Sequence, residues 1–172
     1  MNILEMSSLQ SYILGLYIIF HGAIHIVFYF NYLDKEKNVF TGWSRKSWIL
    51  DKYFSTNIVK IIGYLFWTAI LVSFTIAGLF TFEIITLKPE IWILTASIIS
   101  IIGYILFYNG MLPTPYHWIL GMVIDIILVI FMLINTQVIY LLITLGIVTI
   151  YGMLFHIKIV SSLVGNKPIV TV

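Results

Sequence analysis

The sequence has no cysteine and very few charged residues. The absence of cysteine among 172 residues excludes thiol chemistry, disulfide bonds and cysteine-ligated metals. Only 9% of the residues are charged, whereas a soluble globular domain carries about 25%. Glycine loops that cradle phosphates, nucleophile triads and dinucleotide fingerprints are also missing. We therefore expect a membrane protein rather than an enzyme of the soluble type.

Long apolar runs dominate what remains. Hydrophobic residues make up 61% of the chain, and one crossing needs about 20 of them in sequence. The runs predict an all-α integral membrane protein, a single domain over residues 1–172 with a five-transmembrane-helix bundle. The expected spans are residues 10–32, 59–82, 91–110, 116–134 and 138–159. The first run is too long for a signal-peptide core, so we interpret it as an uncleaved span.

The fourth and fifth spans are separated only by Asn135, Thr136 and Gln137, and one bent helix is the competing interpretation. Charge placement favours two crossings. With five crossings, eight of the nine Lys and Arg residues share one side and only Lys88 lies opposite, which is the bias typical of cytoplasmic loops. We expect the N-terminus outside and the C-terminus in the cytoplasm. The net charge of +2 reflects this bias and does not indicate nucleic-acid binding.

The longest polar section, residues 31–57, follows the first span. Within it, residues 42–54 place Trp43, Leu50 and Phe54 near one helical face, with most of the basic residues elsewhere. This pattern predicts an interfacial helix in the headgroup layer of the lipid bilayer. An irregular loop whose tryptophans belong to the aromatic belt remains an equal alternative.

Two histidines and one aspartate lie deep inside the spans. His21 and His25 are one helical turn apart in the first span, with Tyr32 close to the same line, and Asp125 of the fourth span falls at a depth between the two histidines. Because an ionised carboxylate is costly in lipid, Asp125 should face the bundle interior, paired with an imidazole or protonated. We call His21, His25, Asp125 and Tyr32 the polar centre. A functional site and a structural hydrogen-bond cluster are both open, and no residue can be assigned a catalytic role.

Other polar residues recur at helical spacing and are secondary candidates. They are Lys60, Tyr64, Thr68 and Thr75 on the second span, Ser97, Ser100, Tyr104 and Tyr108 on the third, and Tyr140, Thr144 and Tyr151 on the fifth. His117 and His156 fall near the cytoplasmic boundary. Each stripe also fits ordinary contacts between membrane helices, where small and hydroxyl residues are common.

Metal and haem sites are alternatives built on the same residues. His21, His25 and Asp125 together resemble a facial triad of two histidines and a carboxylate. No glutamate stands beside the histidines as it does in zinc proteases. Haem b would need histidines of similar depth on facing helices, which leaves only a pairing that includes His25. We therefore predict no bound cofactor.

Several short patterns carry a family resemblance. These are His21-Gly22-x-x-His25, Thr41-Gly42-Trp43-Ser44, Gly63 with Trp67, Trp92 with Ser100, and Gly121-x-x-x-Asp125. Together they resemble a group of small, uncharacterised prokaryotic integral membrane proteins with four or so spans and a His-Gly-x-x-His first transmembrane helix. The resemblance covers residues 12–134 and implies a recurring architecture in the prokaryotic cell membrane. The chain departs from that pattern from Val138 onward.

These observations lead to one functional expectation with two alternatives. We expect a non-enzymatic accessory subunit, or a module that handles protons or a small ligand, in a larger membrane complex with other membrane subunits. The first alternative is a metal- or haem-binding redox subunit that uses the same histidines. The second is a purely structural subunit that packs against other helices.

Overall fold

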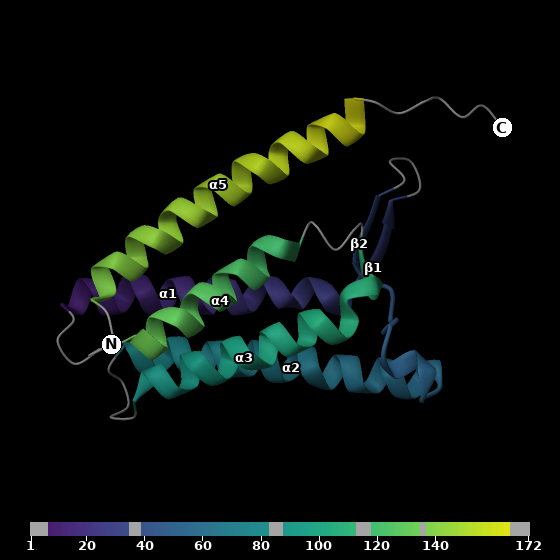
Figure 1. The fold of residues 1–172 in the computed structure, drawn as a ribbon, viewed down its shortest axis with the longest axis horizontal. Coiled ribbons are helices and arrows are strands. Elements are labelled where there is room, and N and C mark those ends of the chain that lie inside the picture. Colours follow the sequence, from purple (N-terminus) through teal and green to yellow (C-terminus); the bar gives the residue numbers. More distant parts are fainter. Residues whose placement is uncertain (1–6, 35–38, 83–87, 113–117, 135–136, 166–172) are drawn as a thin grey trace.

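The computed structural model describes residues 7–34, 39–82, 88–112, 118–134 and 137–165; for 31–41, 112 and 156–165 it describes the backbone alone. Within these ranges the chain is mostly helical (Figure 1). The α-helices are α1 (Ser8–Ile24), α2 (Thr56–Thr81), α3 (Pro89–Phe107), α4 (Ile119–Ile134) and α5 (Val138–Gly165). Short 3-10 helices are η2 (His25–Tyr29), η3 (Leu50–Lys52) and η4 (Tyr108–Gly110). The strands are β1 (Asn31–Asp34), β2 (Val39–Trp43) and β3 (Met111–Leu112).

Four helical segments are long and apolar enough to cross a membrane. They are Ser8–Tyr29, Thr56–Thr81, Pro89–Gly110 and Val138–Phe155. Helix α4 is as apolar but has only 16 residues. Successive helices alternate in direction along the bundle, so α2 and α4 run opposite to α1, α3 and α5 (Figure 1).

Local sequence explains where α1 begins and where it ends. Ser7 and Gln10 form a reciprocal capping box, in which each side chain accepts from the other residue's backbone N–H. At the other end, the ring of His25 lies against the carbonyls of His21 and Gly22, which a regular helix would use for its own backbone bonds. The chain tightens into the 3-10 turn η2 at this point.

The prediction that the first helix continues to residue 32 is wrong, because an antiparallel sheet begins at Asn31. The sheet has the order β1-β2-β3, with Asn31 opposite Gly42 and Trp43 opposite Met111. Gly42 has a φ of +110° and lies against the carbonyl oxygen of Phe30, where a Cβ atom would be only 1.9 Å away. Only glycine suits this position.

The interfacial helix expected over residues 42–54 is also absent from the structure. Strand β2 runs to Trp43, and the residues after it form turns and the short η3. Ser47 and Trp48 donate side-chain hydrogen bonds to the carbonyls of Leu106 and Ile105 at the end of α3, each at 2.6 Å. Carbonyls in the last turn of an α-helix are open to partners from outside the helix, and this segment follows the end of α3 instead of forming a helix of its own.

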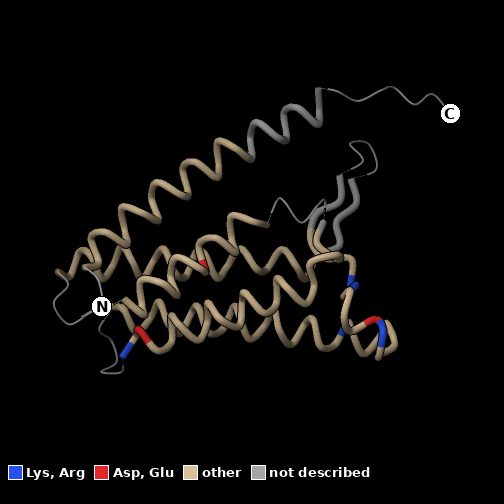
Figure 2. The backbone as a smooth tube through the Cα atoms, viewed as in Figure 1, with Lys and Arg blue, Asp and Glu red and all other residues tan. Residues whose placement is uncertain are grey.

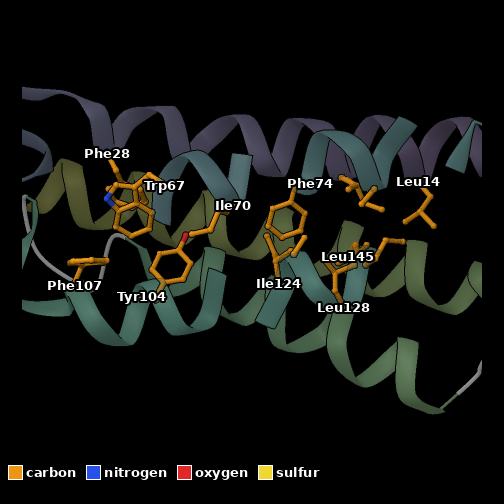
Figure 3. Close-up of a cluster of buried hydrophobic side chains, with 14 of the residues drawn as sticks. Leu14, Phe28, Trp67, Ile70, Phe74, Tyr104, Phe107, Ile124, Leu128 and Leu145 are labelled. Atoms are coloured by element: carbon orange, nitrogen blue, oxygen red, sulfur yellow. The ribbon is translucent and has the colours of Figure 1, made fainter. Parts of the chain in front are cut away.

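A core of buried side chains runs along the bundle. Figure 3 shows aromatic rings around Phe28, Trp67 and Phe107 toward one end, and aliphatic chains around Leu14, Leu128 and Leu145 toward the other. The sheet adjoins the aromatic end, because the ring of Trp43 contacts that of Phe107 with centroids 4.9 Å apart.

Glycines allow α1 and α2 to approach each other closely. A Cβ atom on Gly15 would lie 2.8 Å from the carbonyl oxygen of Gly78, and one on Gly78 would lie 2.7 Å from that of Gly15. Small residues commonly allow membrane helices to pack at such short range. This contact brings the histidine-bearing face of α1 against α2.

Helix α5 packs on the bundle mainly through its first half. Val138, Leu141 and Leu145 are buried, whereas Ile150 and Phe155 are mostly exposed. Figure 1 shows α5 diverging from the other helices toward its C-terminal end. The hydroxyls of Tyr17 and Thr149 are 2.8 Å apart and join α5 to α1.

Candidate functional site

Two ionisable side chains from different helices meet inside the bundle. His21 Nε2 of α1 lies 2.7 Å from Asp125 Oδ1 of α4, and the two side chains are 3% and 0% exposed. Each residue lies in the middle third of its helical segment. Figure 2 shows charged residues at the two ends of the bundle and an acidic position within α4. The charged residue of α4 is Asp125.

His25 forms a second buried contact one turn further along. Its Nδ1 lies 3.2 Å from the carbonyl oxygens of His21 and Gly22, and its Nε2 lies 3.0 Å from Ser100 Oγ of α3. Carbonyl oxygens only accept hydrogen bonds, so Nδ1 carries a hydrogen. In the neutral imidazole Nε2 is then an acceptor, and the Ser100 hydroxyl donates to it.

Aromatic rings surround both imidazoles. The Phe74 ring meets His21 edge-on at 5.0 Å and is nearly parallel to His25 at 6.0 Å. Further rings near His25, with centroids between 5.7 and 6.3 Å, are those of Phe28, Trp67 and Tyr104. These contacts enclose the histidines between α1, α2 and α3 and keep the site apolar around its hydrogen bonds.

Two buried oxygens in or beside the site have no hydrogen-bond partner within the described residues. Asp125 Oδ2 is buried without a hydrogen bond, and so is Ser97 Oγ, one turn before Ser100 on α3. A buried oxygen of this kind is rare in folded proteins. A carboxylate oxygen without a partner can accept a further hydrogen bond.

The structure brings together only part of the predicted polar centre. Asp125 contacts His21, while His25 bonds to Ser100, which had been a secondary candidate. Tyr32 lies in β1 and not on the helical face of the histidines, and its side chain is not described. His117 lies outside the described residues, and so does the side chain of His156.

The predicted polar stripes differ in whether their side chains are buried in the site. On α3, Ser97, Ser100 and Tyr104 are buried, whereas Tyr108, the first residue of η4, is 47% exposed. On α5, Tyr140 and Tyr151 are 57% and 75% exposed, so this stripe does not join the site. The hydroxyls of Thr75 and Thr144 donate to their own helices at Leu71 and Tyr140.

The stripe of α2 forms a separate surface contact rather than part of the site. Lys60 Nζ lies 5.8 Å from the centre of the Tyr64 ring, which stacks on Tyr29. The Tyr29 and Thr68 hydroxyls are hydrogen-bonded to each other. The face of α2 that meets the histidines instead carries Trp67 and Phe74.

On α2, Trp67 and Phe74 are site residues that we did not predict from the sequence. Their spacing of seven residues, with Gly63 and Ile70 on the same buried face, is the signal that identifies the interior side of α2. In an almost wholly apolar helix, this signal is weak. The hydroxyl residues of the opposite face of α2 were the more conspicuous pattern, but they do not line the site.

The arrangement does not suit a metal or haem. Both ring nitrogens of His25 are engaged, one by backbone carbonyls and one by Ser100, so this histidine has no free lone pair for a metal. Within the part of the chain that the structure describes, no three His, Asp or Glu residues are grouped to hold a metal ion. The facial-triad hypothesis therefore finds no support in the geometry.

Comparisons with known protein families, with curated proteins and with solved structures found no match to this chain.

Proposed function

We propose that this chain is an integral membrane protein of the prokaryotic cell membrane with five crossings, its N-terminus outside and its C-terminus in the cytoplasm. The four long apolar helices support this placement. Helix α4 is about 24 Å long at 1.5 Å per residue, and it runs opposite to α3 and α5 (Figure 1). With five crossings, the basic residues other than Lys88 share the cytoplasmic side.

Within this protein, we propose that the polar centre binds and releases a proton inside the bilayer, in a module without catalytic activity of its own. The observation that carries this function is the 2.7 Å contact between His21 and Asp125, both almost fully buried. Ionisable groups at such depth are expensive and usually serve ion or proton pathways.

The chemistry of the pair follows from its charges. With one shared proton, the pair is neutral overall, either as imidazolium and carboxylate or as imidazole and carboxylic acid. The proton moves between Nε2 and Oδ1 without a change in net charge. A second proton arriving at the unpartnered Oδ2 produces imidazolium beside carboxylic acid, and the site gains one positive charge. Proton loading is therefore coupled to a change in buried charge.

His25 and Ser100 control the neighbouring position. Because Nδ1 of His25 already carries a hydrogen, His25 can gain a proton only at Nε2. The Ser100 hydroxyl, which donates to this atom, must then turn away. This rotation would move the hydroxyl hydrogen from His25 toward other acceptors in the site. Ser100 thus acts as a positioning residue for the proton on His25.

A site that only binds and releases a proton has to be coupled to another process in the membrane. Most of the described chain is apolar helix, so we propose that it is an accessory subunit that works with other membrane subunits. Purification in a mild detergent, followed by mass spectrometry of the copurifying proteins, tests this part. A stoichiometric membrane partner is expected. Recovery of the chain alone from native membranes at endogenous expression contradicts the accessory role.

Infrared difference spectroscopy tests the proton function. The protein is reconstituted in lipid vesicles, and spectra are compared across a pH titration. We expect the C=O band of a buried carboxylic acid, which Asp125→Asn removes and which His21→Gln shifts. Asp51→Asn is the matched control, because Asp51 is an exposed acid at the end of the bundle. This variant should leave the band unchanged.

Two results would contradict the proposal. A titration in which no buried carboxyl band changes with pH would mean that the pair is a fixed structural contact. A band that persists in Asp125→Asn would assign the proton to another group. In either case the pair would only hold α1 and α4 together, as the structural alternative predicts.

A further inference from the structure

A second cluster of charge lies at the sheet end of the bundle, away from the polar centre. It consists of Arg45 and Lys46 after β2, Lys52 in η3, and Lys60 early in α2. We call these four residues the basic rim. Figure 2 shows basic residues gathered at this end. The N-terminal part of α3, at the other end, carries Lys88 and Glu90, which are opposite in charge.

The charges of the basic rim have no acidic partner among the described residues. The ion pair between His21 and Asp125 lies deep in the bundle and does not involve the basic rim. Asp51, the acid nearest in sequence, accepts a hydrogen bond from the backbone N–H of Ser47 at 3.1 Å. Lys60 contacts the face of Tyr64. Four basic residues and one acid leave this surface with a net charge of about +3 at neutral pH.

Exposed aromatic rings accompany the basic rim. Trp48, Tyr53 and Phe54 are 47%, 76% and 44% exposed. Trp48 is nevertheless fixed in place, because its Nε1 donates to the carbonyl of Ile105 at 2.6 Å. Amphipathic rings are enriched at the level of lipid headgroups. The surface thus combines cations with rings suited to the same layer.

We propose that the basic rim binds the phosphate groups of anionic phospholipids in the cytoplasmic leaflet. This inference rests on the membrane placement proposed above. Basic clusters beside membrane helices attract anionic lipids. A phospholipid fits better than free phosphate, because the exposed rings and the apolar flanks of α2 and α3 supply contacts for its acyl chains.

The test uses the full-length protein purified in a neutral detergent and stripped of lipid. It is titrated with phosphatidylglycerol, phosphatidylcholine or glycerol 3-phosphate, and binding is followed by native mass spectrometry and tryptophan fluorescence. The wild-type protein should bind phosphatidylglycerol most tightly, and added salt should weaken this binding. The double variant Lys46→Gln/Lys52→Gln should bind it about 25-fold more weakly, at about fivefold per basic residue.

Two variants act as controls. Lys88→Gln removes a basic residue at the opposite end and should leave phosphatidylglycerol binding unchanged. Lys46→Arg/Lys52→Arg keeps the charge and should retain binding. If the glutamine variant fails to fold, as judged by circular dichroism, the salt dependence and the lipid preference of the wild-type protein decide the question.

Equal affinity for the two lipids overturns the inference, and so does a folded glutamine variant that binds as the wild type does. Equal binding of glycerol 3-phosphate would identify a site for soluble anions instead of lipids. Failure of the membrane placement would be seen separately, as release of the protein from membranes by alkaline carbonate. A protein that stays in the membrane without a lipid preference contradicts only the lipid inference.

Discussion

At the scale of single residues, the His21–Asp125 contact is stabilising only while both partners are present. In the proposed membrane placement, a charged carboxylate at the depth of Asp125 costs about 2.5 to 3.5 kcal/mol on insertion scales. The imidazole offsets this cost through a short, charge-assisted hydrogen bond of 2.7 Å. Loss of either side chain leaves the other buried without this hydrogen bond.

A double-mutant cycle measures this coupling. His21→Ala and Asp125→Ala should each lower the free energy of unfolding by about 3 to 5 kcal/mol, as expected when a buried pair loses one partner. The double variant should lose less than the sum, with a coupling energy of about 1 to 3 kcal/mol. Reversible unfolding in bicelles gives the four values. A strictly additive double variant would show that the two side chains do not interact.

The residue-scale predictions from sequence succeeded where the cost of burial decides the outcome. Asp125 has to face the interior and find a partner because lipid solvates a carboxylate poorly. Depth along two straight helices placed it near the histidines but could not choose between them. That choice depends on the rotation of α1 and α4 about their axes, which packing around Phe74 and Ser100 decides.

At the scale of elements, the sheet is docked on the bundle through Trp43. Its ring lies on Gly63 of α2, where a Cβ atom would come within 1.9 Å of Trp43 Cη2. Its indole N–H donates to the carbonyl of Lys46 at 2.9 Å. Trp43 therefore connects β2, α2 and the following turn.

Gly63→Ala should displace the Trp43 ring and destabilise the protein by about 1 to 3 kcal/mol, the usual effect of overpacking. Gly146→Ala is the matched control, because nothing lies within 4 Å of a Cβ atom there. It should be neutral or stabilising by up to about 1 kcal/mol, since alanine favours helix.

Thermal unfolding in detergent compares the two alanine variants, and adding Trp43→Phe to Gly63→Ala should restore part of the loss. Equal melting temperatures for Gly63→Ala and Gly146→Ala would exclude close packing of Trp43 on α2.

The small sheet could not be predicted from the sequence. Its formation depends on the positive φ of Gly42 and on pairing with Met111, which is far away in the chain. The aromatic pattern of residues 42–54 was compatible with a helix or a loop. The contacts of Ser47 and Trp48 with the end of α3 settle that segment, and they are tertiary.

At the scale of the whole molecule, the length of the apolar runs determines most of the architecture. The four long helices follow directly from the apolar runs. Helices α4 and α5 are also separate, as expected, and they run in opposite directions (Figure 1). Helix α5 diverges from the bundle (Figure 1) and buries few of its described side chains. Hydropathy alone does not reveal this, because it does not say which apolar residues are buried.

The proposed topology can be measured directly because the chain has no cysteine of its own. Single cysteine substitutions fit three exposed positions: Ser8→Cys at the first residue of the first span, and Tyr53→Cys and Gln137→Cys between spans. An impermeant maleimide should label Ser8→Cys and Gln137→Cys in intact cells, and Tyr53→Cys only after permeabilisation. The inverse pattern would reverse the orientation, and an unlabelled Gln137→Cys would argue against separate fourth and fifth crossings.

The most direct test of the account is solid-state NMR of the protein in lipid bilayers with ¹⁵N-labelled histidine. The His21 ring signals, assigned with His21→Gln, should shift in Asp125→Asn and stay unchanged in Asp51→Asn. The His25 signals should be those of a neutral ring with hydrogen on Nδ1, and Ser100→Ala should alter them. Ring signals of His21 that do not respond to Asp125→Asn would contradict the buried pair on which the proposed function depends.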